Sequence, residues 1–252
     1  MIKKKFTFKG TDNIDLMAEL DLPDSKVNYY ALFAPCFTCT KNLRAVKYIT
    51  RSLNENGIAL FRFDFPGLGE SKGNFTDTSF STNLENIRIA YKYMRDNLEA
   101  PELLIGHSLG GVAMIRLAME FDSVNAIAII ASADNPSLLA AAMSKTRDQA
   151  KYEGFATTNI GGSEFVLTDS FFEDLYKNGK LHDLTKVTKP VLTMYSPDDM
   201  TIAYKYIIKN FTDTNGQNSY ISLNNMGHLM EKPKDAQKVG NLISAWSKLY
   251  CS

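Results

Sequence analysis

Short apolar runs alternate with amphipathic helical patterns along most of the chain. Near the N-terminus, the runs KKKFTF and IDLMAELDL lie on either side of the polar segment KGTDN, which is typical of an antiparallel hairpin. The run YYALFAP at residues 29–35 is continuously apolar and predicts a strand that is buried on both faces. Residues 42–56 then repeat apolar side chains at helical spacing, and Gly57 ends that pattern.

The same alternation continues beyond this first unit. Further strands are predicted at residues 58–63, 102–107, 125–133, 190–196 and 219–223, and further helices at 78–97, 108–121 and 233–249. A hairpin followed by repeated strand–helix units predicts a mostly parallel central sheet with helices on both faces. The fold class is therefore α/β, and residues 1–252 are expected to form a single domain.

One long segment between Ser132 and Pro190 interrupts the alternation. AAAMSKTRDQAKYEG has a helical pattern, and FATTNIGGSEFVL indicates a hairpin that turns at Gly161–Gly162. Long excursions at the C-terminal edge of a parallel sheet are usually functional, so residues 133–188 are predicted to form a small cap, or lid, inserted over a pocket. Aromatic side chains are expected to pack this cap onto the body or else to line an acyl pocket: Phe155, Phe171, Phe172 and Tyr176.

Composition and charge exclude several classes of function. The 252 residues include 28 basic and 28 acidic side chains, so there is no surplus of positive charge to neutralise nucleic-acid phosphates. The longest apolar stretch, AIAIIASA, is far shorter than the roughly 20 residues that a membrane span needs. The lysine-rich start MIKKKFTFKG lacks the apolar segment of a secretory signal. A soluble, cytoplasmic protein is expected, and its three cysteines are a poor disulfide framework.

The stretch LIGHSLGGVAM at residues 104–114 carries the strongest chemical signal. Gly106, Ser108 and Gly110 fit G-x-S-x-G between a predicted strand and a predicted helix. Such a turn strains the serine backbone, and a side chain at either glycine would collide with neighbouring backbone. Ser108 is then presented at a helix N-terminus, where the N–H of Leu109 points at any anion formed there. The alternative is a glycine-rich turn beside an N-capping serine.

A serine hydroxyl needs a base that takes its proton, and the chain has three histidines. His107 lies within the motif beside the serine, so its side chain is expected to point elsewhere. His182 lies in a polar stretch and is interpreted as a surface residue. His228 follows the last predicted strand, in a loop expected above the strand ends, and it is the predicted base.

The imidazole in turn needs an acid that fixes its tautomer. The segment TMYSPDDMTI follows a predicted strand and offers Asp198 and Asp199, one of which is expected to be a turn residue. Asp134, after the preceding strand, is the second position considered. Asp64 also ends a strand, but it is interpreted as holding the Gly67–Gly69 turn through backbone N–H groups.

Taken together, these residues resemble the α/β-hydrolase superfamily over the whole chain, including its order of Ser, Asp and His. FRFDFPGLGESKG is similar to the F-D-x-x-G-x-G-x-S stretch of many members. More narrowly, ALFAPCFTCTKN, LLIGHSLGG, YSPDDMTI and GHLMEKPKDA resemble the serine hydrolase domain that is often fused to an OsmC-like domain; here a standalone domain is expected. The resemblance implies an α/β-hydrolase fold and Asp199 as the acid, with Ser108 and His228.

The resemblance also implies a role for the loop after the third strand. That loop is expected to supply the second oxyanion donor through the backbone N–H of Phe37, beside that of Leu109. Cys36 and Cys39 flank the donor, and Pro35 stands where that family usually has histidine. A thioredoxin-like redox pair is the alternative interpretation of the two cysteines. A metal site is disfavoured because the chain has no second Cys/His pair at zinc spacing.

The expected function is that of a serine hydrolase, specifically a carboxylesterase that cleaves small or medium acyl esters through an acyl-serine, without a cofactor or metal. Its expected partner is a small-molecule ester, with no nucleic acid and no membrane, and the protein is either a monomer or a dimer. Thioesterase, acyltransferase, amidase or perhydrolase chemistry would use the same residues. A non-catalytic ligand-binding protein of this fold is the alternative from a different class.

Overall fold

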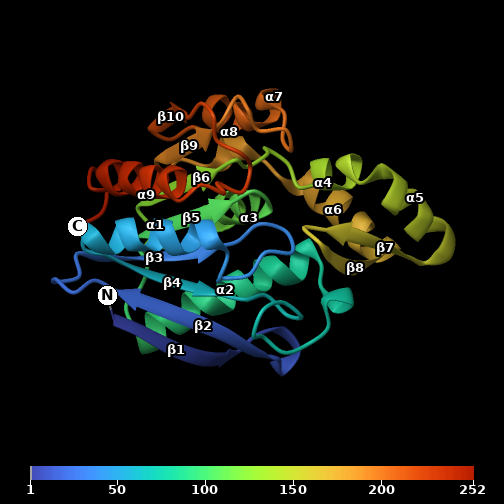
Figure 1. Ribbon diagram of the computed structural model, residues 1–252, viewed down its shortest axis with the longest axis horizontal. Helices are drawn as coiled ribbons and strands as arrows, with labels where there is room; N and C mark the ends of the chain where they lie inside the picture. The colour runs from blue at the N-terminus through green and yellow to red at the C-terminus, as the bar shows by residue number, and fades with distance from the viewer. Residues whose placement is uncertain (1) are drawn as a thin grey trace.

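One twisted sheet of eight strands forms the centre of the computed structural model, which describes residues 2–252 (Figure 1). In order across the sheet, the strands are β1 (Ile2–Lys9), β2 (Asp15–Leu22), β4 (Ile58–Phe63), β3 (Tyr29–Ala34), β5 (Leu103–His107), β6 (Ala126–Ile130), β9 (Val191–Tyr195) and β10 (Asn218–Ser222). The pairs β1–β2 and β2–β4 are antiparallel, and the remaining pairs are parallel. The carboxyl ends of the parallel strands therefore lie along one edge of the sheet.

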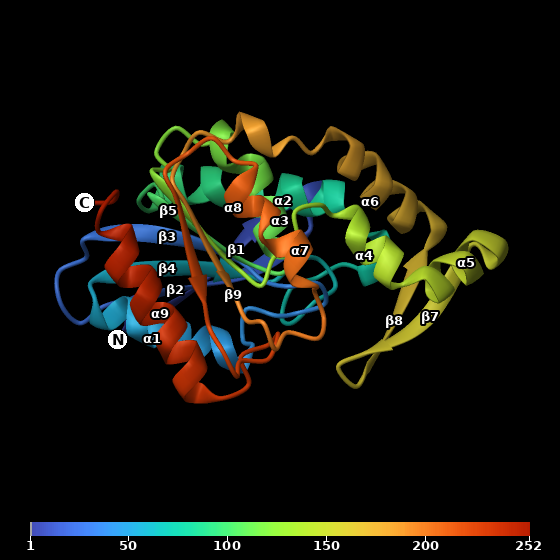
Figure 2. The ribbon, with the colours of Figure 1, turned by 90° about the horizontal axis from the view of Figure 1, so that it is seen from above.

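Helices cover both faces of this sheet (Figure 2). On one face, α1 (Arg44–Glu55) packs beside α9 (Pro233–Ser247) over a buried apolar cluster. On the other face, α2 (Phe80–Asn97) and α3 (Leu109–Leu117) bury a second cluster together with the β1–β2 hairpin. Removal of these apolar side chains from water is the main force that holds the layers together.

The start of α2 illustrates how a local capping pattern sets an element boundary. The side chain of Ser79 accepts a hydrogen bond from the N–H of Thr82, and the Thr82 hydroxyl oxygen accepts one from the N–H of Ser79. This reciprocal capping box satisfies N–H groups that have no partner within the helix. The helix therefore begins at Phe80 rather than at Thr78, where the sequence pattern predicts it.

Residues 133–188, here called the excursion, project from one end of the sheet (Figures 1 and 2). The excursion contains α4 (Ser137–Ala142), α5 (Ser144–Glu153), the hairpin of β7 (Phe155–Ile160) and β8 (Ser163–Thr168), and α6 (Asp169–Leu181). The hairpin turns at Gly161–Gly162, as predicted, whereas the predicted helix is divided at Met143 and α6 was not expected. The side chain of Asp174 on α6 accepts hydrogen bonds from the N–H and hydroxyl of Ser81, which ties the excursion to the start of α2.

The aromatic side chains of the excursion divide into two groups. Phe171 and Phe172 are buried, which agrees with their expected packing role. Phe155 and Tyr176 are 52% and 36% exposed, and Tyr176 instead contacts Arg147 of α5, within the excursion. Exposed aromatic residues that occur singly are common on protein surfaces.

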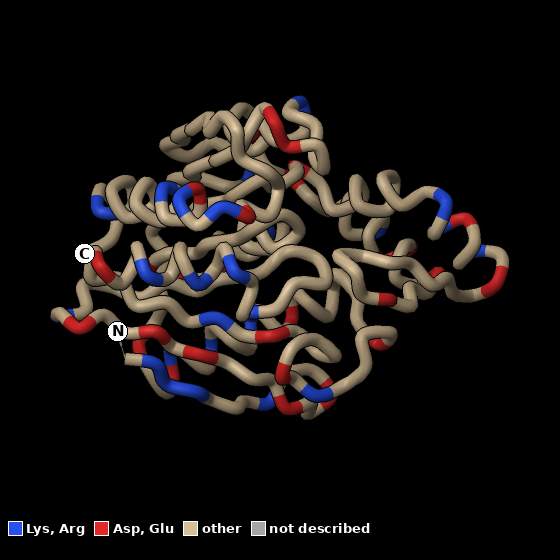
Figure 3. The backbone as a smooth tube through the Cα atoms, in the orientation of Figure 1, with Lys and Arg blue, Asp and Glu red and all other residues tan. Residues whose placement is uncertain are grey.

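The predicted α/β architecture, a mostly parallel sheet with helices on both faces, is confirmed. Two short helices between β9 and β10, α7 (Tyr204–Ile207) and α8 (Lys209–Thr212), were not predicted. Basic and acidic side chains are interspersed over the molecule (Figure 3). Among the helices of residues 2–252, none has the length and apolar character that a membrane crossing requires.

Candidate active site

Ser108 lies in a sharp turn between β5 and α3. Its backbone has φ 54° and ψ −122°, a region that residues other than glycine seldom adopt. A Cβ atom at Gly106 would lie 2.5 Å from the Cα atom of Gly111. One at Gly110 would lie 2.3 Å from the carbonyl oxygen of Ala34. Glycine at these two positions is therefore what allows the strand, the turn and the helix to pack so closely.

The structure brings Ser108, His228 and Asp199 together, although they lie in three separate loops. Nε2 of His228 is 3.0 Å from Oγ of Ser108, and Nδ1 of the same ring is 2.8 Å from Oδ2 of Asp199. These distances fit a ring that donates from Nδ1 to the carboxylate and accepts the serine hydroxyl at Nε2. The three side chains form one continuous line of hydrogen bonds at the carboxyl edge of the sheet.

Asp199 is held in its ionised form by its surroundings. Burial works to raise the pKa of this carboxyl, but its hydrogen bond to His228 and the charge of that ring outweigh burial, and the pKa lies below its usual value. The N–H groups of Thr201 and Ile202 add to this effect, because both donate to Oδ1.

The other two acids considered for this position lie elsewhere. Asp198 accepts a hydrogen bond from the N–H of Asn225, which is a loop contact. Asp134 faces Lys209, with its Oδ2 3.3 Å from the ammonium nitrogen. Of the three acids, Asp199 is the one in contact with the imidazole of His228.

His107 supports the loop that carries His228. Its Nε2 lies 2.8 Å from the carbonyl oxygen of His228, and since a carbonyl only accepts, this nitrogen carries the proton. Burial, followed by the charge of His228, lowers the pKa of His107 to about 3, so the ring is neutral near pH 7. The sequence predicted that the His107 side chain points away from Ser108, but it did not predict the contact between His107 and the loop that carries His228.

His182 differs from its interpretation as a surface residue. Both of its ring nitrogens are buried and have no hydrogen-bond partner within residues 2–252. Burial, together with the charge of Arg116, lowers the pKa of this ring to about 4. The polar sequence around it suggested exposure, but the end of α6 packs against the body.

Two backbone N–H groups beside Ser108 are free to bind a ligand. Within residues 2–252, no hydrogen bond engages the N–H of Phe37 or that of Leu109. Both residues line the same cavity as Ser108. Unpaired backbone N–H groups at a cavity wall are able to donate to an acceptor oxygen of a bound ligand.

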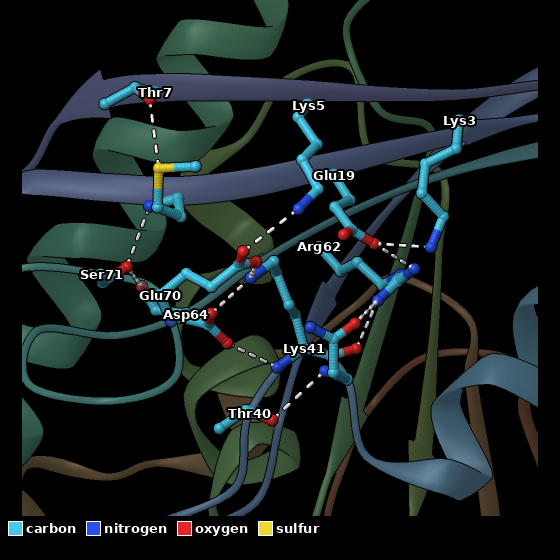
Figure 4. A network of polar contacts seen from close by, with 12 residues as sticks. Lys3, Lys5, Thr7, Glu19, Thr40, Lys41, Arg62, Asp64, Glu70 and Ser71 are labelled. Atoms are coloured by element: carbon cyan, nitrogen blue, oxygen red, sulfur yellow. Dashed lines mark hydrogen bonds and ion pairs between the residues drawn. The ribbon is translucent and has the colours of Figure 1, made fainter.

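The β3–α1 loop that carries Phe37 also contains a buried lysine, Lys41 (Figure 4). Nζ of Lys41 lies 2.5 Å from Oδ2 of Asp64 and 2.6 Å from Oε2 of Glu70, and its N–H donates to Oδ1 of Asp64 at 2.7 Å. The carbonyl oxygen of Lys41 accepts a hydrogen bond from Arg62. The side chains of Lys41 and Asp64 are fully buried. Every polar group of Lys41 is therefore engaged.

The charges around Lys41 stabilise one another. Burial alone would lower the pKa of the Lys41 ammonium, but its hydrogen bonds to Asp64 and Glu70 raise it above the usual value. Hydrogen bonds from Lys41 and, to a smaller extent, from Lys5 lower the pKa of Glu70 to about 2. Asp64 also accepts the N–H of Glu70, in line with its expected turn-holding role, but the sequence did not reveal its pairing with Lys41.

Cys36 and Cys39 form a disulfide within the same loop. This pairing differs from the expectation that three cysteines make a poor disulfide framework. Cys251 is the remaining cysteine, and it is free and buried.

A cavity of about 340 Å³ opens beside Ser108. Its wall runs from Phe37 and Leu109 to Leu138 and Leu139, on α4 of the excursion, and to Ile202 after β9. The size falls in the usual range for small-molecule sites. None of the side chains that line it, among residues 2–252, carries a charge. The cavity is suited to an uncharged, largely apolar group.

The sheet order, the strained serine between β5 and α3, and the imidazole above it define an α/β-hydrolase. The family model described as serine aminopeptidase, S33, matches residues 40–181. This match covers more than half of the 252 residues, so the chain belongs to that family.

Solved structures support the same assignment. The chain is 33% identical to the esterase domain of a Rhodothermus marinus protein, with a TM-score of 0.78 and 99% of each chain covered. The mouse alpha/beta hydrolase domain-containing protein 10 is 19% identical, with a TM-score of 0.81 over 98% of this chain and 99% of that one. Est1E from Butyrivibrio proteoclasticus with bound ferulic acid is also 19% identical, with a TM-score of 0.77 over 97% and 99%. The last two likenesses concern the fold.

A curated relative is the mitochondrial palmitoyl-protein thioesterase ABHD10 of Rattus norvegicus. The two chains are 25% identical over 179 residues, which is 69% of this chain. The match spans 59% of the length of the rat protein.

Proposed function

We propose that this α/β-hydrolase is a serine esterase that cleaves uncharged carboxylic esters through an acyl-serine intermediate. The observation that supports the proposal most directly is the continuous line of contacts from Asp199 through His228 to the hydroxyl of Ser108. The identity of 33% to the esterase domain from Rhodothermus marinus supports the same type of reaction.

In the proposed reaction, Oγ of Ser108 attacks the ester carbonyl carbon while Nε2 of His228 takes the hydroxyl proton. Asp199 orients the imidazole and stabilises the imidazolium that forms. The N–H groups of Phe37 and Leu109 bind the oxygen that becomes negative, and one such donor typically lowers the barrier by about 3 kcal/mol. The imidazolium then protonates the leaving alcohol, and His228 activates the water that hydrolyses the acyl-serine.

The cavity supports an ester with an uncharged acyl group over a peptide with a free amino terminus. An aminopeptidase needs a carboxylate near the serine to hold the ammonium group of its substrate, and no such side chain lines this cavity in residues 2–252. Residues 133–188 are proposed to act as a cap, because Leu138 and Leu139 of the excursion form part of the cavity wall. We expect this wall to limit acyl chain length.

Hydrolysis of p-nitrophenyl esters by the purified protein tests the proposal. We expect Ser108→Ala to lower kcat by at least about 10⁴-fold and to prevent labelling by a fluorophosphonate probe, measured by intact mass. A Ser108→Ala protein that hydrolyses these esters at the wild-type rate would overturn the proposal.

The adjacent aspartates provide a matched pair of variants for the same assay. We expect Asp199→Asn to lower kcat by about 10⁴-fold, because the amide favours the wrong imidazole tautomer. Asp198→Asn should remain close to the wild-type value, since Asp198 accepts a loop N–H and does not contact His228. Equal losses in the two variants would contradict the role given to Asp199.

A thioesterase is the second candidate, favoured by the relationship to the rat palmitoyl-protein thioesterase. The same residues would attack a thioester carbonyl, with a thiol as the leaving group. Matched oxygen esters and thioesters, from acetyl to palmitoyl, distinguish the two candidates. Higher kcat/KM for long-chain thioesters than for the matched oxygen esters would favour the thioesterase; the reverse order would favour the esterase.

A further inference from the structure

Residues 34–41, the segment that includes Phe37, are held at both ends by close contacts. At its start, the carbonyl oxygens of Ala34 and Pro35 lie so close to Gly110 that a Cβ atom there would approach them to 2.3 and 2.4 Å. At its end, Lys41 is fixed by Asp64. The donor itself lies between these two anchors, so its position depends on what holds residues 36–39.

Residues 36–39 are closed into a small ring by the disulfide between Cys36 and Cys39, which encloses Phe37 and Thr38. The N–H of Cys39 also donates to the carbonyl oxygen of Cys36 at 3.0 Å. Thr38 has φ 61°, a left-handed conformation that a β-branched residue rarely adopts. An unfavourable conformation persists only where its surroundings impose it, and here the disulfide supplies the covalent constraint.

The ring of Phe37 links this small loop to the excursion. It stacks on Phe171 of α6 with the ring centroids 5.3 Å apart, and it contacts Phe75 at 5.7 Å. Phe37 lines the cavity beside Ser108, and its N–H has no hydrogen-bond partner within residues 2–252. A change in the 36–39 turn therefore moves both a proposed oxyanion donor and part of the cavity wall.

The two cysteines differ in their exposure to solvent. Cys36 is 5% exposed, whereas Cys39 belongs to the partly exposed residues of the loop. Thiol–disulfide exchange requires a thiolate to reach a sulfur atom of the disulfide. Cys39 is the more exposed of the two residues, so we expect an external thiol to attack its sulfur.

We propose that the Cys36–Cys39 disulfide is a redox site that controls turnover of the hydrolase, an inference that rests on the proposed function. A dithiol reductant attacks Sγ of Cys39 through one thiolate and displaces Cys36 as a thiolate, which takes up a proton. The second thiol of the reductant then attacks the mixed disulfide and releases Cys39. The protein gains two thiols, and the reductant leaves as a disulfide.

Reduction is expected to act on kcat more than on KM. The two N–H donors stabilise charge that exists in the transition state, so a displaced Phe37 N–H weakens an interaction absent from the bound substrate. Loss of one oxyanion donor lowers kcat by about 10²–10³-fold, which sets the upper limit. Because the anchors at Gly110 and Lys41 remain after reduction, we expect a fall of at least about ten-fold within that limit.

The test compares oxidised and reduced wild-type protein with one p-nitrophenyl ester. The protein is treated with dithiothreitol, freed of it by gel filtration without air, and alkylated in denaturant for intact mass. One alkyl group is expected on the oxidised chain, at Cys251, and three on the reduced chain. The reduced protein should show the lower kcat, and oxidised dithiothreitol should restore it.

Two variants complete the experiment. Cys36→Ser/Cys39→Ser should have the low kcat of the reduced protein and no response to dithiothreitol. Cys251→Ser is the matched control: its thiol lies against the carbonyl oxygen of Glu102, far from the loop in the sequence, and it should respond like the wild type. Near-UV circular dichroism of the wild type in both states measures folding independently of the variants.

Three outcomes would overturn the inference. The first is a fully alkylated, reduced protein with unchanged kcat. The second is a reduced protein whose lost activity accompanies a lost near-UV signal, because the disulfide would then be structural. The third is a chain that carries three thiols as purified and forms no disulfide with oxidised dithiothreitol. Failure of the proposed function looks different: oxidised protein then shows no hydrolysis that depends on Ser108.

Discussion

The β5–α3 turn and the β3–α1 loop each place one N–H group beside Ser108, but they are held by different kinds of contact. In the turn, backbone packs directly on backbone, and Gly106 and Gly110 leave the space for it. In the loop, side chains hold the backbone: Lys41 binds Asp64, and Cys36 is bonded to Cys39. The turn is positioned by close packing alone, whereas the loop, which also packs on Gly110 at its start, is held in addition by charge and a covalent link.

This difference determines how each region responds to change. Close packing leaves little room for adjustment, so the turn is sensitive to added volume and insensitive to redox conditions. Buried charges and a disulfide depend on protonation and oxidation, so the loop responds to its chemical surroundings. An enzyme that uses both donors therefore combines one fixed contact with one adjustable contact.

Of the variants that test this difference between the turn and the loop, Lys41→Met is expected to have the largest effect on stability. Methionine keeps much of the side-chain volume but leaves the buried carboxylate of Asp64 without its cation. Removal of one partner of a buried ion pair typically costs 3–5 kcal/mol, so we expect the free energy of unfolding to fall by about 4 kcal/mol. Urea denaturation of the oxidised protein measures this, and kcat should fall as well because the loop loses its anchor.

Lys5→Met is the matched control for that variant. Lys5 also binds Glu70, at 3.1 Å, but its side chain is 56% exposed. Exposed ion pairs contribute roughly 0–1 kcal/mol, so the loss should be below about 1 kcal/mol, with kcat unchanged. Similar losses for Lys41→Met and Lys5→Met would show that burial does not distinguish the two lysines.

Gly110→Ala tests the turn by adding a single methyl group. The new Cβ atom would meet the carbonyl oxygens of Ala34 and Pro35. Overpacking of this kind typically costs 1–3 kcal/mol, and backbone atoms yield less than side chains, so we expect a loss of about 3 kcal/mol by urea denaturation. In Gly161→Ala, the control at the tip of the excursion hairpin, no atom lies within 4 Å of the new Cβ. Because Gly161 has a positive φ, alanine there should lower the free energy of unfolding by roughly 1–2 kcal/mol, and kcat should not change.

Mild acid should lower the free energy of unfolding through His107 before it does so through Glu70. The pKa of His107 is about 3 in the folded protein against 6.5 in the unfolded chain, so between these values the unfolded state binds the extra proton and stability falls as pH falls. The corresponding loss from Glu70 begins only as pH falls below 4.5 toward 2. In the wild type, the free energy of unfolding should therefore fall with pH between 6.5 and 4.5. We expect His107→Gln to reduce the slope of this fall by up to about 1.4 kcal/mol per pH unit.

Urea denaturation at several pH values measures that slope. His182 also has a lowered pKa, near 4, so part of the wild-type slope should remain in His107→Gln and should disappear when His182→Gln is added. An unchanged slope in the double variant would contradict the assignment of these two buried rings as neutral.

The fold was largely predictable from the sequence because it follows from local patterns. Continuous apolar runs mark the buried strands, helical spacing marks α1 and α2, and Gly161–Gly162 marks the hairpin turn. The G-x-S-x-G motif likewise locates Ser108, because the glycines reflect a steric need within five adjacent positions. With three histidines in the chain, His228 could be selected by its place after the last strand.

The features that were not predicted depend on partners far along the chain. The sequence gives Lys41 the appearance of an ordinary polar loop residue, but it is buried and paired with Asp64, which directly follows β4. His182 stands among polar residues, yet the packing of α6 covers its ring. The bond between Cys36 and Cys39 requires a backbone turn whose left-handed residue, Thr38, is not glycine and gives no local signal. Such tertiary effects override local propensity.

The stacking of Phe37 on Phe171 has a consequence for chimeric enzymes. A segment swap that replaces residues 133–188 with the corresponding part of a relative also removes the ring on which Phe37 rests. We therefore expect such an exchange to change both substrate range and turnover number, even when the inserted segment carries none of the reacting groups. A transplanted segment that keeps an aromatic residue at position 171 is the one expected to change acyl preference alone.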